Sequence, residues 1–412
     1  MPETVRTAFA DEPRPLLSYG IPFPSAAARH VPGLFNASRV YIICSGSLAR
    51  NTDSLERLKS ALGEDKVVGV RIGMKSHTQW SEVFEIVQDA KQVGADLLLT
   101  LGAGSLTDGA KIVALALANN IQKASDLLNL TATSPNKGSI HPPTVPIVSI
   151  PTSLSAGEYS NFAGGTDDTT PGSSRKHSFS YPTQGPQLII LDPELTSTTP
   201  DSIWLSTGIR AVDHCVETLC ALRGGIGTDT YDAMARHALG LLVPGLVRCK
   251  RDAKDLEARL QCQLGSVDAM AACASGNIQL GASHGIGHQL GPLGVGHGET
   301  SCILLPAVCK FNAAHNANND RQDLVRQFLL HNDIVKDVLS RHGVDADKAD
   351  LGDVLDAVIR ELGLPRSLKD VGVGREQLDG LAENSLHDRW CVSNPVPLKE
   401  KGQVWEILEK VM

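Results

Sequence analysis

The stretch that decides the fold of this 412-residue chain is Ala95-Asp-Leu-Leu-Leu-Thr-Leu-Gly-Ala-Gly-Ser-Leu-Thr-Asp-Gly-Ala-Lys111. Its apolar first half predicts a buried strand over 95–101, and a helix follows from about Thr107. The glycines between them let the backbone turn tightly, so that N–H groups and a helix start can hold a pyrophosphate. A plain strand-to-helix turn has the same pattern, because the glycines follow neither G-x-G-x-x-G nor a Walker loop. The candidate phosphate contacts are Gly102, Gly104, Ser105 and Asp108.

A second turn of small hydroxyl residues favours the nucleotide interpretation. The sequence Pro151-Thr-Ser-Leu-Ser-Ala-Gly-Glu158 follows another apolar run, 145–150, which predicts a strand. Turns that follow parallel strands fall at the same carboxyl edge of a sheet, where ligands bind. We therefore predict a nucleotide at this edge, and the second turn adds the contacts Thr152, Ser153 and Ser155.

The rest of the first half alternates strands and helices in the same way. Helical patterns occupy about 51–62 and 78–94, and further strands are predicted at 39–44, 67–72 and 187–191. This alternation predicts an α/β domain with a doubly wound, mostly parallel sheet. The segment 164–180 is rich in Gly, Ser, Thr and Asp and is expected to be an exposed loop or hairpin.

The second half has a different pattern. Apolar residues recur at three- and four-residue spacing in five segments: 203–222, 229–251, 255–275, most of 320–342, and 397–412. Strand signals nearly vanish there. We therefore expect a nucleotide-binding domain over 1–197 and an all-helical catalytic domain over 198–412.

Composition excludes several classes of partner. Lys and Arg number 38 against 46 Asp and Glu, and the net charge of −8 gives no general attraction to nucleic acid. No apolar run approaches the length of a membrane span, and the N-terminus lacks the apolar region of a secretory signal. The nine cysteines are scattered without a C-x-x-C pair, as in a reduced cytoplasmic protein. We expect a cytoplasmic location, with neither nucleic acid nor membrane as a partner.

Histidines gather in the helical half. His284 and His288 are four residues apart and would share one face of a helix. With His214 and His297 they suggest a metal site or a proton relay, whereas a single such residue would be an ordinary core histidine. Glu217, one turn after His214, either orients an imidazole or is a solvated acid.

In combination and in order, these motifs resemble the iron-containing (group III) alcohol dehydrogenases and, among them, the maleylacetate reductases. The family loop G-G-G-S-x-x-D-x-A-K is similar to 102–111, and its P-T-T turn is similar to 151–158. The family's link between domains is similar to 191–196, and its long C-terminal signature to 284–306. The resemblance implies a dehydroquinate synthase-like architecture, a homodimer, and Lys176 near the cofactor.

One departure from the family pattern concerns the metal. Metal-dependent members bind their ion with D-x-x-x-H and two later histidines, but Arg210 stands at the acidic position here. Asp213 lies roughly 100° round the helix from its neighbour His214, which makes it a poor substitute. A permanent guanidinium charge opposes a divalent cation, so we predict a site that works without metal. If a metal is bound, the resemblance makes its ligands His214, His284 and His297.

The resemblance also implies a hydride transfer between a nicotinamide nucleotide and a carbonyl. Arg210 would stabilise the developing oxyanion or pair with a substrate carboxylate, and a proton would come from His288 or His284. Arg210 could instead form a structural ion pair with Asp213 or Glu217. Both NADH and NADPH are permitted, because the segment 44–47 lacks an acid for the ribose and Arg50 is nearby. The catalytic candidates are Arg210, His214, His284, His288 and His297.

These expectations define three functions. The first is an NAD(P)H-dependent, metal-independent oxidoreductase that reduces a carboxylated ketone or enone, as maleylacetate reductases do. The second is a non-redox enzyme, a dehydratase, lyase or specialised-metabolite enzyme, that uses the Arg/His pocket on the same scaffold. The third is a binding protein without catalysis, which the four histidines argue against.

Overall fold

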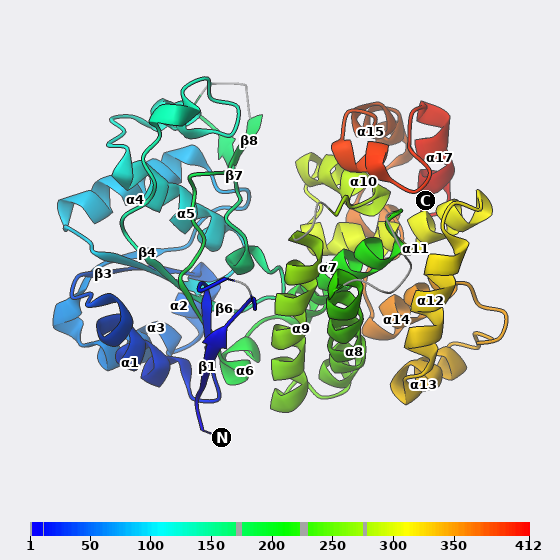
Figure 1. The fold of residues 1–412 in the computed structure, drawn as a ribbon, viewed down its shortest axis with the longest axis horizontal. Helices are drawn as coiled ribbons and strands as arrows, with labels where there is room; N and C mark the ends of the chain where they lie inside the picture. The colour runs from blue at the N-terminus through cyan, green and yellow to red at the C-terminus, as the bar shows by residue number, and fades with distance from the viewer. Residues whose placement is uncertain (1, 11, 170–174, 223–229, 275–277) are drawn as a thin grey trace. The chain divides into compact units, whose positions relative to one another are not determined.

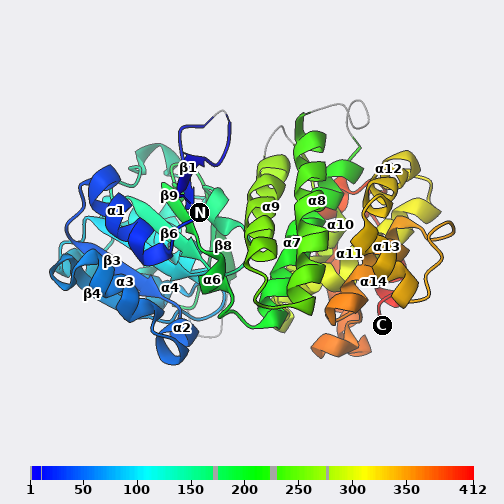
Figure 2. The same ribbon diagram turned by 90° about the horizontal axis from the view of Figure 1, so that it is seen from below.

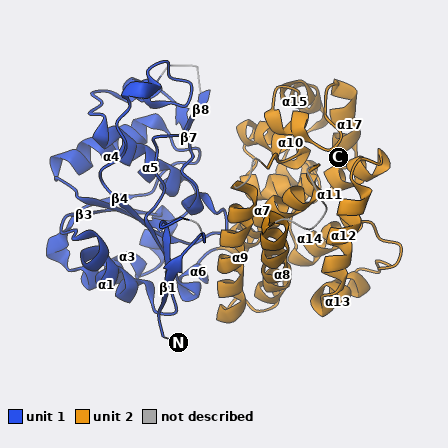
Figure 3. Ribbon diagram, viewed as in Figure 1, with its two compact units in different colours: residues 1–199 blue, residues 200–412 orange. Residues whose placement is uncertain are grey.

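The computed structural model describes residues 2–10, 12–169, 175–222, 230–274 and 278–412. The chain forms two compact units, residues 1–199 and 200–412 (Figure 3). The division predicted after residue 197 falls in the same stretch of chain. Each unit has its own hydrophobic core, so the two are described separately.

The first unit contains a seven-stranded sheet in the order β1-β2-β9-β6-β5-β3-β4. All neighbouring pairs are parallel except β1 and β2, which confirms the predicted mostly parallel sheet. The strands are β1 (Thr4–Thr7), β2 (Leu16–Tyr19), β3 (Val40–Cys44), β4 (Val67–Ile72), β5 (Leu97–Gly102), β6 (Ile147–Pro151) and β9 (Leu188–Leu191).

Helices cover both faces of this sheet, α4 and α5 on one and α1 and α3 on the other (Figure 1). The period-two geometry of a strand explains the arrangement, because successive side chains point to opposite faces. Within β3, Tyr41 and Ile43 pack in the core beneath α4 and α5, whereas Ile42 and Cys44 pack with α1 and α3. The helices of this unit are α1 (Phe23–Phe35), α2 (Gly46–Asn51), α3 (Ser54–Leu62), α4 (Trp80–Gln92), α5 (Ser105–Ala118) and α6 (Pro193–Thr196).

The predicted loop or hairpin at 164–180 is a hairpin in the part that the structure describes. Strands β7 (Ala163–Asp167) and β8 (Arg175–Phe179) pair antiparallel as a separate two-stranded sheet, and residues 170–174 lie outside the described ranges. Most of β7 is buried rather than exposed. Its small residues allow this, because a Cβ on Gly165 would lie 3.0 Å from both Ile112 and Trp80.

The second unit is all-helical in its described residues, as the sequence predicts. Helices α7, α8 and α9 lie side by side (Figures 1 and 2). The predicted helix at 320–342 is two helices, because the Asn332 side chain accepts a hydrogen bond from the backbone N–H of Ile334 and starts a new one. The helices are α7 (Asp201–Cys220), α8 (Thr230–Arg251), α9 (Leu256–Ala274), α10 (Ala282–Leu290), α11 (His297–Ala314), α12 (Asn319–Leu330), α13 (Asp333–Arg341), α14 (Leu351–Leu362), α15 (Leu378–Ser385), α16 (Arg389–Ser393) and α17 (Lys401–Glu409).

Two further observations bear on the sequence expectations. Within the described ranges, no helix combines the length and the apolar character that crossing a bilayer requires. All nine cysteines are free thiols, and eight of them are buried.

Asp192 anchors the end of the first unit, and its loss should destabilise the fold. Its carboxylate is buried and accepts hydrogen bonds from the N–H groups of Glu194, Leu195 and Phe23 at 2.9, 3.1 and 2.8 Å. Asp192→Ala leaves three donors without an acceptor and should cost about 2–3 kcal/mol in urea unfolding. Glu194→Ala, at an exposed position of the same helix, is the control. Equal stability of the two variants would contradict this role.

Candidate active site

The two polar turns predicted from sequence lie at one edge of the sheet. Cys44 of β3 pairs with Leu101 of β5, and Gly102 of β5 pairs with Pro151 of β6. Beyond the strands, the N–H of Thr152 donates to the carbonyl of Gly102 at 3.2 Å. The carboxyl ends of neighbouring strands are therefore in register, and their turns meet.

The turn after β5 contains the two glycines predicted to contact phosphate. Gly104 is the N-cap of the 14-residue helix α5 with φ of +62°, and no side chain caps the helix there. Gly102 has φ of +142°, and a Cβ on it would lie 2.5 Å from Leu106. Both positions require glycine, and a helix start without a side-chain cap suits a pyrophosphate.

The remaining predicted cofactor residues lie around these turns. Ser153 and Ser155 face each other with their hydroxyl oxygens 3.1 Å apart. Asp108 turns towards β7, where it accepts a hydrogen bond from the N–H of Gly164 at 3.1 Å. Lys176 belongs to β8, and its side chain lies against the same glycine, because a Cβ on Gly164 would come within 2.9 Å of it.

Two buried charged residues, which the sequence did not single out as site residues, hold the second turn in place. The ammonium of Lys111 donates to the carbonyls of Gly157 and Phe162 at 2.7 and 2.8 Å. Glu158 accepts from the hydroxyl of Thr107 at 2.7 Å. Helix α5 therefore supports the turn after β6 through three hydrogen bonds, and burial lowers the pKa of Lys111 and raises that of Glu158.

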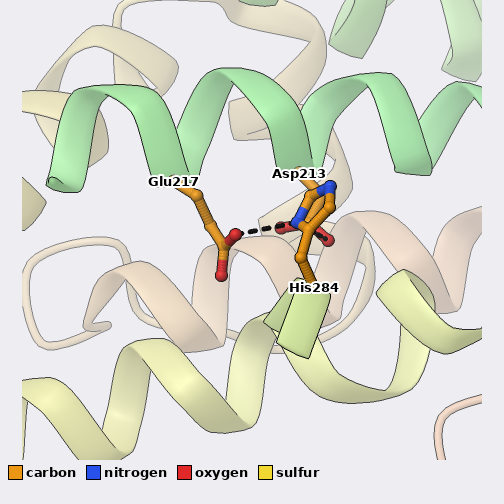
Figure 4. Close-up of side chains that lie close together, drawn as sticks. All are labelled: Asp213, Glu217 and His284. Atoms are coloured by element: carbon orange, nitrogen blue, oxygen red, sulfur yellow. Dashed lines mark hydrogen bonds and ion pairs between the residues drawn. The ribbon is translucent and has the colours of Figure 1, made fainter. Parts of the chain in front are cut away.

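The second unit holds a cluster of buried charges on α7 and α10. Asp213 and Glu217 project from α7 towards His284 of α10 (Figure 4). The Nδ1 atom of His284 lies 2.7 Å from Glu217 and 3.4 Å from Asp213. The sequence left the role of Glu217 open, and the structure shows that it orients an imidazole, that of His284.

Each carboxylate in the cluster has several donors. Glu217 also accepts from the N–H groups of Gly281 and Ser283 at 2.8 and 2.9 Å. Asp213 accepts from the hydroxyls of Ser283 and Ser301 at 2.8 and 2.6 Å. Such hydrogen bonds offset the free-energy cost of burying the two acids.

Arg210 supplies a guanidinium at the edge of this cluster. Its Nη1 atom lies 3.2 Å from the hydroxyl of Ser301 and 4.0 Å from Asp213, and its side chain is 12% exposed. The ion pair with Asp213 is therefore long. Because only one end of the guanidinium is engaged in these two contacts, Arg210 retains N–H groups for a ligand.

Burial sets the protonation of the cluster. It raises the pKa of Asp213 to about 6 and that of Glu217 to about 7. Burial, together with the nearby Arg210, lowers the pKa of both His214 and His284 well below the ordinary value. Both rings are therefore neutral at physiological pH.

The four predicted histidines occupy different environments. The rings of His214 and His284 stack with centroids 4.9 Å apart, and one nitrogen of each, Nδ1 and Nε2 respectively, is buried without a partner. His288 is half-buried and hydrogen-bonds to Asp388, whereas His297 is exposed at the start of α11. Among the described residues, the group with ligand atoms all within 4.8 Å of one another is Asp213, Glu217 and His284. The three histidines that the resemblance makes metal ligands do not form such a group.

Sequence reasoning missed Ser283, Ser301 and Asp388. No local signal marks them, because serines are common in helices and Asp388 is 100 residues from the histidine it contacts. The sequence does contain a local pattern for three other site residues, since the spacing of Arg210, Asp213 and Glu217 places them along one face of a helix.

The buried acids predict a stability that depends on pH. Because the pKa of Glu217 is higher in the folded chain than the ordinary 4.5, the folded state binds this proton more tightly than the unfolded state. Ionisation of Glu217 should therefore reduce the free energy of unfolding as pH rises from about 4.5 to about 7. Urea unfolding at several pH values in this range should show that the free energy of unfolding falls less steeply with pH in Glu217→Gln than in the wild type. The exposed Glu383→Gln is the control, and equal slopes in both variants would contradict the assignment.

Known protein families match both units. The iron-containing alcohol dehydrogenase model matches residues 21–193, and the C-terminal model of the Fe-containing alcohol dehydrogenase family matches residues 204–412. Dehydrogenase FUM7 of Gibberella moniliformis is 39% identical, over 96% of this chain and 95% of its own. Dehydrogenase ALT3 of Alternaria alternata is 40% identical, over 91% and 99%.

A solved structure at lower identity has the same fold. Sulfoacetaldehyde reductase from Bifidobacterium kashiwanohense, in complex with NAD⁺, is 19% identical over 96% of each chain, with a TM-score of 0.77. The two matching models together cover most of the chain, and two relatives near 40% identity cover nearly all of it. The protein is therefore an alcohol dehydrogenase-type oxidoreductase and belongs to the iron-containing alcohol dehydrogenase family.

Proposed function

We propose that this oxidoreductase uses NADH or NADPH to reduce a carboxylated ketone or enone of the maleylacetate type, without a catalytic metal. The observation that carries the proposal is the largely buried guanidinium of Arg210, 3.2 Å from Ser301 beside the Asp213–Glu217–His284 cluster. A fixed positive charge of this kind suits an oxyanion or a carboxylate.

The turn after β5 supports the nucleotide. Its positive-φ glycines and the uncapped start of α5 fit a pyrophosphate, and a relative of the same fold binds NAD⁺. When bound, a reduced nicotinamide nucleotide would supply the hydride. The hydroxyls of Ser45 and Ser47 lie 2.9 Å apart after β3, and a Cβ on Gly46 would lie 2.9 Å from the Arg50 guanidinium. A turn with hydroxyls and a nearby cation tolerates a ribose 2′-phosphate, so both nucleotides remain in the proposal.

The residues present do not fit a divalent metal. Asp213 and Glu217 already accept hydrogen bonds from several donors, and the Nδ1 atom of His284 is engaged with Glu217. The guanidinium of Arg210 adds a permanent positive charge 4.0 Å from Asp213. Oδ1 of Asp213 and Nε2 of His284 have no hydrogen-bond partner, but a cation held through them would lie beside a like charge. A cation held through the other ligand atoms would also have to break these hydrogen bonds.

Two residues divide the chemistry of the reduction between them in this proposal. Arg210 would donate hydrogen bonds to the oxygen on which negative charge develops, or to a carboxylate that orients the substrate. His284 is fully buried and its pKa is lowered well below the ordinary value, so it is poorly suited to carry a proton. His288, 38% exposed in its side chain, can exchange protons with solvent and is the proposed proton donor.

Nucleotide binding at the turn after β5 is testable at Gly104. Gly104→Leu places a side chain at φ of +62°, where L residues are strained, and next to the N–H groups that would hold the pyrophosphate. We expect at least a tenfold weaker Kd for NADH and NADPH by fluorescence titration. Gly138→Leu, at an exposed position with open space around its Cβ, is the control. Unchanged affinity in the Gly104 variant would place the nucleotide elsewhere.

Metal independence and the role of Arg210 are testable together. Maleylacetate-dependent oxidation of NADH or NADPH should survive exhaustive chelation, and Arg210→Ala should lose roughly two to three orders of magnitude in kcat. Arg210→Lys, which keeps the charge but not the fork of donors, should recover part of the loss. Near-stoichiometric metal in the purified protein, with activity lost on chelation, would overturn the metal-free site. Substrate turnover without nucleotide oxidation would favour the non-redox alternative.

The proposal includes a homodimer, as the resemblance implies. Light scattering at micromolar concentration should give twice the mass of the 43.8 kDa chain. A monomer under these conditions would contradict it.

A further inference from the structure

We propose that Asp388 is a positioning residue that fixes the tautomer of His288, so that the proton His288 gives and regains is the one on Nε2. The inference rests on the proposed function, because it assigns His288 the role of proton donor. It adds a residue that no motif marks and that touches neither the Arg210 cluster nor the nucleotide turns.

The first support is the hydrogen bond itself. The Nδ1 atom of His288 lies 2.9 Å from Oδ2 of Asp388, whose side chain is 13% exposed. An ionised carboxylate only accepts, so Nδ1 must carry the proton in this bond. The other ring nitrogen, Nε2, is then left for chemistry on a half-buried ring. A second partner fixing the tautomer of a proton-transferring histidine is a recurring device in catalysis.

The second support is the rigidity of the carboxylate. Oδ1 of Asp388 accepts a hydrogen bond from the N–H of Trp390 at 2.9 Å and thereby caps α16. One carboxylate oxygen therefore binds the helix start and the other binds His288. Helix α10 approaches this cap so closely that a Cβ on Gly285 would lie 2.5 Å from Sγ of Cys391 and 3.3 Å from Oδ1 of Asp388. Gly285 is three residues before His288, on the same side of the helix. The close packing of α10 on α16 therefore sets the distance between the carboxylate and the imidazole.

The third support is the proximity of His288 to the Arg210 cluster. His288 follows His284 by one turn of α10, so the two imidazoles lie on the same face of that helix. Of the two histidines proposed for proton transfer, it is the one with access to solvent. A proton lost from Nε2 can therefore be replaced from water.

These groups account for the hydride and the proton that the reduction of a carbonyl requires. A bound reduced nucleotide would supply a hydride to the substrate carbonyl carbon and become oxidised, and the carbonyl oxygen would gain a proton. That proton leaves Nε2 of the His288 imidazolium, which becomes the neutral ring protonated on Nδ1. Asp388 accepts the hydrogen bond from Nδ1 before and after the step and is not itself protonated.

The decisive variant is Asp388→Asn. Asparagine is also a good N-cap, so its side-chain oxygen can keep the bond to Trp390 and preserve α16. Its amide nitrogen would then face Nδ1 of His288 as a donor, and the neutral ring must move its proton to Nε2. This change is measured by the ring ¹⁵N shifts of histidine-labelled protein, with His288 assigned by its loss in His288→Asn. We expect the Nδ1–H form in the wild type and the Nε2–H form in the variant. The same tautomer in both proteins would overturn the proposal.

Kinetics give the second readout. Asp388→Asn should lower kcat for maleylacetate reduction roughly 100-fold, leave KM for the nucleotide unchanged and raise the solvent deuterium isotope effect, because proton transfer becomes slower. A merely structural loss would not raise that isotope effect. A kcat within twofold of the wild type, or an unchanged isotope effect, would contradict the assignment.

A matched control exists in the same unit. Nδ1 of His237 lies 2.8 Å from Oδ2 of Asp268, which reproduces the geometry at a histidine side chain that is 68% exposed. Asp268→Asn should change neither kcat nor the isotope effect. If wild-type protein reduces none of maleylacetate, other oxo acids or simple ketones, the proposed function fails, while the tautomer measurement still decides the role of Asp388.

Discussion

The burial of two carboxylates on one face of α7 is the constraint on which the helical unit depends. Asp213 and Glu217 are fully inside the protein, where an uncompensated charge would cost several kcal/mol. Several groups offset this cost: backbone N–H groups at the start of α10, hydroxyls from α10 and α11, an imidazole and a guanidinium. The mutual positions of α7, α10 and α11 are therefore fixed by polar contacts as well as by apolar packing.

The same physical solution recurs in the sheet unit with the charges reversed. Lys111 is buried completely, and backbone carbonyls from the loop after β6 satisfy its ammonium. Lys111 ties α5 to a loop, and the two acids tie α7 to α10 and α11. Such buried ionic groups position these segments rather than add net stability, because desolvation offsets much of the electrostatic gain. The loop tied by Lys111 follows the hydroxyl-rich turn, and that turn lies beside the glycine turn in the register of β5 and β6. Rigidity is thus concentrated where a ligand would need prearranged donors.

Membership of the iron-containing alcohol dehydrogenase family fixes the fold and the class of chemistry, but not the ion or the substrate. A family can keep its scaffold and change one ligand, and we propose that position 210 is such a place in this chain. An arginine in place of an acid would change both the sign of the local charge and the geometry of donors, since it offers a planar fork where a carboxylate would accept. The proposed substrate class follows from that change in sign.

The sequence by itself determined the alternation of strands and helices, the position of the glycine turn and the helical character of the second half. These follow from local periodicity and from backbone conformations that only glycine adopts readily, as at Gly102 and Gly104. It also singled out Arg210, with Asp213 or Glu217 as a possible ion-pair partner. Only the tertiary structure decided three sets of contacts: the pairing of Glu217 with His284, the hydrogen bonds from the hydroxyls of Ser283 and Ser301, and the contact of Asp388 with His288. Those contacts join residues 67 to 100 positions apart, and their energies depend on which helices pack together, which no local pattern encodes.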